Sequence, residues 1–234
     1  MRYAIYFTPP NDDALTGLAS VWLGRDAFTG LTVARPRSSR LTPEELAFHT
    51  APARRYGFHA TIKAPFRLAD DASPEGLGAA LEAFGAHRAP FTVKLALRQM
   101  GGFFALVPEV RSPALDQLAG DVVTAFASFG APLSDAEIER RNPENLSPEE
   151  LRNLHQWGYP YVFEEFRFHM TLTGRVAADD ALRVRAAIEE HFGDLLHRDV
   201  EIGSLALFTE DSPGEPFHVL SCHPFQSMPE RKTA

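Results

Sequence analysis

Two five-residue segments of this sequence share one pattern: phenylalanine, histidine, a variable residue, threonine and an aliphatic residue. They are Phe58–Ile62 and Phe168–Leu172. His-x-Thr alone is weak evidence, because this composition gives about 0.5 chance occurrences per chain. The full pattern is expected by chance only about 0.007 times. Two copies therefore indicate that the segments are related and share a role.

The spacing defines which side chains act together, because residues two apart on a strand point to the same face. His59 and Thr61 then share one face, and His169 and Thr171 share one face of a second strand. Their apolar neighbours point the other way, toward a core. If the two strands face each other, the four polar side chains meet in one cleft.

Cationic side chains continue both polar faces. By the same alternation, the cations in line with the histidines are Lys63, Arg55, Arg167 and Arg175. A stripe of imidazole, hydroxyl and cation suits a phosphate group. We expect Lys63 and Arg167 to bind phosphate and Arg175 to contact substrate. A solvent-facing or edge-strand charge is the alternative for each.

Two histidines can hydrolyse a phosphodiester by general acid–base catalysis. One imidazole accepts a proton from the attacking water, and the other donates a proton to the leaving oxygen. An ordinary imidazole pKa near 6.5 allows both protonation states near neutral pH. Threonine hydroxyls can bind the non-bridging oxygens. A structural hydrogen-bonding role is the alternative for a lone strand histidine, and the duplication makes it the weaker one.

A catalytic metal is disfavoured by the same segments. A zinc enzyme supplies about three protein ligands, whereas each segment brings one histidine and no Asp, Glu or Cys at short spacing. We therefore expect no metal and no cofactor.

The elements that must position these residues also repeat. The order strand, helix, strand, strand is predicted twice, over residues 55–63, 74–86, 91–98 and 103–107, and again over 166–176, 179–193, 200–208 and 217–223. Interspersed strands and helices of this kind predict an α+β fold. We expect one bilobal domain, 1–234, with lobes near 55–110 and 166–225. Its two antiparallel sheets would face a central cleft by pseudo-two-fold symmetry, with helices on the outer faces.

Residues 135–165 have no counterpart in this repeat and are expected to form an insert or lid. The segment combines cations and aromatics, among them Arg140, Arg141, Trp157 and Tyr159. Long loops near a cleft commonly carry specificity, so Trp157 and Tyr159 are candidate substrate contacts. A small satellite core under a loop is the alternative.

The runs Arg55–Phe66 and Phe166–Gly174 resemble the 2H phosphoesterase superfamily, the LigT-like group. They look most similar to an uncharacterised branch found beside phosphonate-utilisation (C–P lyase) genes. The resemblance implies metal-independent hydrolysis of a cyclic phosphodiester. It also implies that His59 and His169 are catalytic and that Thr61 and Thr171 bind phosphate.

Composition limits the other function classes. The 234 residues include 44% hydrophobic and 23% charged residues, typical of a globular domain, with a formal net charge of −8. An acidic chain is unsuited to coating long nucleic acid. The single cysteine, Cys222, allows no intramolecular disulfide, which suits a reducing compartment. With no expected membrane span or secretory segment, we expect a cytoplasmic location and no membrane partner.

Three hypotheses follow. The first is hydrolysis of a small cyclic phosphate, such as a phosphoribosyl cyclic phosphate in phosphonate metabolism. The second is processing of RNA ends that carry a 2′,3′-cyclic phosphate. The third is a phosphate-ligand binding module without turnover. The sequence does not define the substrate, which histidine is the acid, or the oligomeric state.

Overall fold

The computed structural model describes residues 1–226 of the chain. Within this range all strand pairings are antiparallel, and the strand order is β6-β3-β4-β5-β2-β1-β7-β8. The strands are β1 (Arg2–Phe7), β2 (Ala60–Phe66), β3 (Phe91–Met100), β4 (Phe103–Pro108), β5 (Met170–Thr171), β6 (Asp199–Ile202), β7 (Ser204–Glu210) and β8 (His218–Pro224). The expected α+β class is confirmed.

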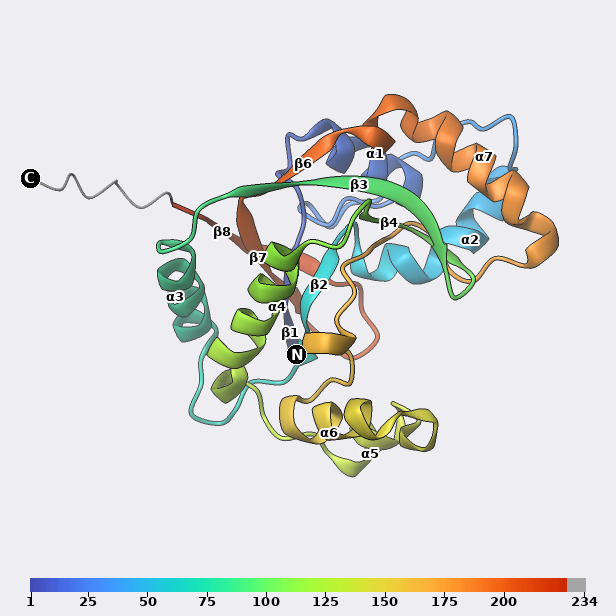
Figure 1. The fold of residues 1–234 in the computed structure, drawn as a ribbon. Coiled ribbons are helices and arrows are strands. Elements are labelled where there is room, and N and C mark those ends of the chain that lie inside the picture. Colours follow the sequence, from blue (N-terminus) through green and yellow to red (C-terminus); the bar gives the residue numbers. More distant parts are fainter. Residues whose placement is uncertain (227–234) are drawn as a thin grey trace, which may run out of the picture.

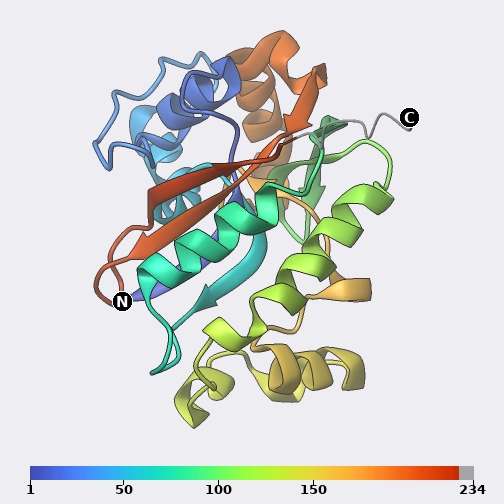
Figure 2. The same cartoon turned by 90° about the vertical axis from the view of Figure 1, so that its left-hand side faces the viewer.

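Helices cover the sheet in groups that both views show (Figures 1 and 2). Helices α3 and α4 lie over the half that contains β2, β7 and β8, while α1, α2 and α7 pack together at the other half. Helices α5 and α6 form a separate group at the edge of the molecule. The α-helices are α1 (Ala14–Leu23), α2 (Pro43–Tyr56), α3 (Pro74–Gly85), α4 (Pro113–Ala125), α5 (Asp135–Glu139), α6 (Pro148–Trp157) and α7 (Ala181–Phe192). Short 3₁₀ turns occupy Ala127–Phe129, Pro143–Asn145, Phe163–Glu165, Ala178–Asp180 and Gly193–His197.

The two motif strands, β2 and β5, are neighbours at the centre of the sheet, where Ala60 pairs with Met170. On one side of this junction lie β1, β7 and β8, and on the other lie β4, β3 and β6. Each half of the sheet therefore combines strands from both ends of the sequence. This interleaved order differs from the grouping by chain order that we expected, in which residues 55–110 and 166–225 each form a lobe.

Both motif strands are shorter than the sequence suggested. Arg55 and Tyr56 are the last residues of α2, and Gly57 ends that helix with φ of 76°. A side chain there would also collide with Ala27, since an added Cβ would lie 2.4 Å from the Ala27 Cβ. The second strand, expected over 166–176, pairs only at Met170 and Thr171. In the described part of the chain, no helix has the length and apolarity needed to span a membrane.

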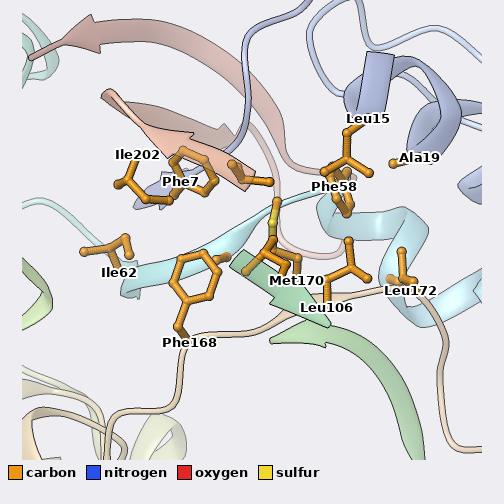
Figure 3. Packing of buried hydrophobic residues seen from close by; sticks show 14 of the residues in the cluster. Phe7, Leu15, Ala19, Phe58, Ile62, Leu106, Phe168, Met170, Leu172 and Ile202 are labelled. Atoms are coloured by element: carbon orange, nitrogen blue, oxygen red, sulfur yellow. The ribbon is translucent and has the colours of Figure 1, made fainter. Parts of the chain in front are cut away.

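The apolar residues of the motifs lie in the core, as the alternation of faces requires. Met170 and Leu172 are fully buried, and Phe58 and Phe168 are nearly so. Figure 3 shows these side chains together with Phe7 and Ile62 of the neighbouring strands. Packing of this cluster fixes the position of the backbone segments that carry His59 and His169.

Met170→Ala should lower the free energy of unfolding by about 2–5 kcal/mol, because truncation of a buried methionine leaves a cavity. The matched control is Leu182→Ala on α7, whose side chain is 82% exposed; its effect should stay within about 0.5 kcal/mol. Urea unfolding of both variants measures the difference. Equal losses would show that the motif strand is not packed as described.

Candidate active site

Polar side chains of both motifs line one cavity of about 360 Å³. Its lining includes His59, Thr61, His169 and Thr171, the four polar residues expected to meet. The antiparallel pairing of Ala60 with Met170 explains why. In an antiparallel pair, the residues on either side of Ala60 and Met170 also lie opposite each other. His59 is therefore opposite Thr171, and Thr61 is opposite His169.

The two imidazoles are held in the same way. His59 Nδ1 lies 3.0 Å from the Gly57 carbonyl oxygen, and His169 Nδ1 lies 2.7 Å from the Arg167 carbonyl oxygen. A carbonyl oxygen only accepts, so Nδ1 carries the hydrogen in both rings. Each Nε2 is therefore the nitrogen that can exchange a proton with a ligand. The Thr61 hydroxyl donates to the Nε2 of His59 over 3.3 Å.

The His59 ring lies against Tyr6 of β1, with ring centroids 3.9 Å apart and an interplanar angle of 25°. Burial disfavours the charged imidazolium and lowers the pKa of His59 from 6.5 to about 4; the nearby His169 lowers it further, while the hydrogen bond to Gly57 opposes the shift. At neutral pH, His59 is thus a neutral imidazole, and its unprotonated Nε2 accepts the hydrogen bond from Thr61.

Three arginines line the same cavity: Arg2, Arg140 and Arg141. Arg2 is anchored by Glu210, with Nε 2.6 Å from a carboxylate oxygen. The Arg141 guanidinium lies 5.0 Å from the ring centroid of Tyr159. Glu137 also lines the cavity, but its carboxylate is paired with Arg67, which lowers its pKa to about 2. The cavity therefore offers cationic donors to an anion.

The insert residues contribute directly to this cavity. Glu137, Arg140 and Arg141 lie in or directly after α5, and Tyr159 follows α6. Trp157 lies outside this cavity: it lines an adjoining one and packs edge-on against Phe163, with ring centroids 5.2 Å apart. The segment thus both borders the site and packs within itself.

Lys63 lies off the His–Thr stripe, contrary to the expectation from simple alternation. In the pairing with β1, Tyr6 faces Thr61 but Ile5 faces Lys63, so β2 contains one extra residue. Such a β-bulge breaks the alternation of faces. Lys63 lines the adjoining cavity instead.

The other predicted cations also lie outside the cavity lining. Arg167 is exposed and donates from Nη1 to the Glu164 and Phe166 carbonyl oxygens, at 2.5 and 2.7 Å. Arg175 is exposed beside Gly102. Arg167 precedes β5, which begins at Met170. After β5 the regular ladder stops, because the N–H groups of Leu172 and Thr173 both donate to the Phe104 carbonyl oxygen. A shared strand face therefore no longer relates these arginines to His169. Arg55, at the end of α2, pairs with Glu210 at 2.5 Å.

Sequence reasoning missed Arg2 and Tyr56 as cavity residues, and the alternation of faces leaves open whether Tyr3 or Tyr6 points to the cleft; the structure places Tyr6 there. Arg2 and Tyr6 are four residues apart on β1 and so share a face. That signal becomes usable only once β1 is known to pair with β2. Among residues 1–226, no group of three or more His, Cys, Asp or Glu side chains could hold a metal ion.

The chain belongs to the family described as "Protein of unknown function (DUF1045)", whose model matches residues 61–218. Two curated relatives are named Ribose 1,5-bisphosphate phosphokinase PhnN. The protein from Janthinobacterium sp. (strain Marseille) is 37% identical over 238 residues, covering 98% of this chain and 52% of the relative. The protein from Laribacter hongkongensis (strain HLHK9) is 36% identical over 219 residues, covering 94% and 50%. The chain spans about half the length of these relatives.

Solved structures of similar fold include the protein TT0787 of Thermus thermophilus, with a TM-score of 0.45, 15% identity and coverage of 96% of this chain and 98% of that one. E. coli LigT complexed with NADP+ has a TM-score of 0.44 and 13% identity, with coverage of 97% and 98%.

His169→Gln should raise the pKa of His59 toward 6.5, because it removes the neighbour whose charge disfavours protonation of His59. Titration of the imidazole Cε1–H resonances by NMR measures the change against the wild type. A pKa that stays the same or falls would contradict the coupling between the two rings.

Proposed function

We propose that this protein is a phosphoesterase that hydrolyses a cyclic phosphodiester of a small phosphorylated sugar or nucleotide. The observation that carries the proposal is the matched orientation of His59 and His169. Both rings donate Nδ1–H to a carbonyl two residues earlier and line one cavity. General acid–base catalysis on the two sides of one phosphorus needs such a pair.

The environments of the rings favour different roles. His59, neutral above about pH 4, accepts a proton from the attacking water through Nε2. As the water oxygen bonds to phosphorus, one ester P–O bond breaks, and His169 Nε2 donates a proton to the departing oxygen. In this mechanism the Thr61 hydroxyl, which bonds His59 Nε2 in the free protein, turns to a non-bridging oxygen when substrate binds and so frees Nε2 for the water. The Thr171 hydroxyl binds the other non-bridging oxygen, and Arg2 or Arg141 balances their charge.

A phosphoribosyl cyclic phosphate in phosphonate metabolism is the substrate we favour. The family resemblance supports it, as do the PhnN names of two relatives that share about half their length with this chain. A cavity of about 360 Å³ suits a small ligand. RNA 2′,3′-cyclic phosphate ends are the alternative substrate, and a binding module without turnover is the alternative class.

His59→Ala and His169→Ala should each lower kcat by about 10²–10⁴-fold on the cyclic phosphate that the wild type hydrolyses, because each removes an acid or base. A panel of ribose and nucleoside cyclic phosphates, followed by phosphorus NMR with EDTA present, identifies that substrate. His87→Ala, at an exposed histidine away from the cavity, is the control and should retain activity.

Full activity in either active-site variant would contradict the two-histidine mechanism. Loss of wild-type turnover with EDTA, restored by zinc or manganese, would replace it with metal catalysis. Binding of every panel member without turnover by the wild type would favour the binding module.

The pH profile of kcat/KM should have its acid limb near pH 4, well below the ordinary imidazole value, because the base must be unprotonated. Activity therefore rises as the pH passes upward through about 4. Initial rates in buffers of constant ionic strength measure this limb. An acid limb at pH 6.5 would contradict the assignment of His59 as the base.

A further inference from the structure

A second cavity of about 380 Å³ adjoins the His–Thr cavity. Four residues line both spaces: Ala64, Pro65, Leu133 and Tyr159. The two spaces are therefore adjacent, and Tyr159 lies on the boundary between them. We call this second space the Lys63 chamber.

Lys63 is the cation of this chamber, and it is only 7% exposed. Its Nζ lies 5.3 Å from the ring centroid of Phe66. Within residues 1–226, it makes no hydrogen bond or ion pair, and no Asp or Glu lines the chamber. An ammonium on a side chain so largely removed from water, with no counter-charge, is stabilised when a bound anion supplies one.

The β-bulge in β2 explains why Lys63 lies in the chamber. Without the extra residue, Lys63 would continue the face of Thr61; with it, Lys63 turns into the chamber. Burial lowers the pKa of Lys63 to about 8, so most molecules still carry the ammonium at neutral pH. The remaining wall includes aromatic and aliphatic side chains such as Trp157 and Ile138, together with the polar side chains of His155 and Gln156.

We propose that the Lys63 chamber binds a second anionic group of the phosphate class, carried by the same substrate whose cyclic phosphate lies between the histidines. This inference rests on the proposed function for the identity of the first group. It makes the protein selective for doubly phosphorylated small molecules. Lys63 then acts on specificity, at a distance from the reacting phosphorus.

Lysine NMR tests the chamber without any turnover. The chain has only three lysines, Lys63, Lys94 and Lys232, so ¹³Cε labelling gives three resonances that Lys63→Met and Lys94→Met assign. Ribose 1,5-bisphosphate should raise the pKa of Lys63, because a bound anion favours the ammonium. Ribose 1-phosphate should leave it nearly unchanged. Equal responses to both ligands, or none, would overturn the proposal.

Kinetics provide the second arm, with ribose 1,2-cyclic phosphate and its 5-phosphorylated form as a matched pair. Wild-type kcat/KM should favour the phosphorylated form about 10- to 100-fold, the range of one charge-assisted contact, and chiefly through KM. Lys63→Met should bring this ratio close to one. Lys94→Met, at a lysine whose side chain is 51% exposed, should retain it.

If Lys63→Met leaves the kcat/KM preference for the 5-phosphorylated form unchanged, the proposal that the chamber binds a second phosphate is wrong. If Lys63→Met does not fold, the ligand-dependent titration in the wild type still decides the matter. Failure of the proposed function is distinguishable: neither compound would be hydrolysed, while the Lys63 pKa would still respond to the bisphosphate alone.

Discussion

The pairing of Ala60 with Met170 joins the two halves of the sheet, and the candidate site depends on it. It sets the register between β2 and β5, and it leaves a histidine and a threonine on each side of the junction. The buried side chain of Met170 and the small one of Ala60 point to the core. The polar residues next to them must therefore face the cavity. Core packing and the geometry of the candidate site are two consequences of one register.

The two histidines are alike in orientation and unlike in surroundings. Each ring is fixed by a hydrogen bond from Nδ1 to its own chain, but only His59 is stacked on buried Tyr6. An imidazole kept neutral by burial is suited to accept a proton. A duplicated motif can thus supply two different chemical roles when neighbouring strands give each copy a different environment.

The sequence predicted the parts of the site that depend on local alternation. His59 with Thr61, and His169 with Thr171, needed only the two-residue period of a strand and lie in one cavity as that period requires. Lys63 lies off the His–Thr stripe because β2 contains a bulge. The bulge arises from the pairing of β2 with β1, so the sequence of β2 alone did not predict it. Arg2 could not be found for a related reason, since its place in the site follows from strand neighbours far apart in sequence. Similarly, Arg167 and Arg175 were placed beside His169 on the assumption of a long strand, but tertiary pairing limits this strand to two residues.

The assignment of roles to the two histidines is tested most directly by changing the leaving group. A 4-nitrophenyl phosphodiester releases a stable anion that needs no proton, so an enzyme without its general acid should recover on it. His169→Ala should then approach wild-type kcat/KM, whereas His59→Ala should remain lower by about 10²–10⁴-fold. Recovery of His59→Ala instead, or equal losses in both variants, would contradict the account of His59 as base and His169 as acid.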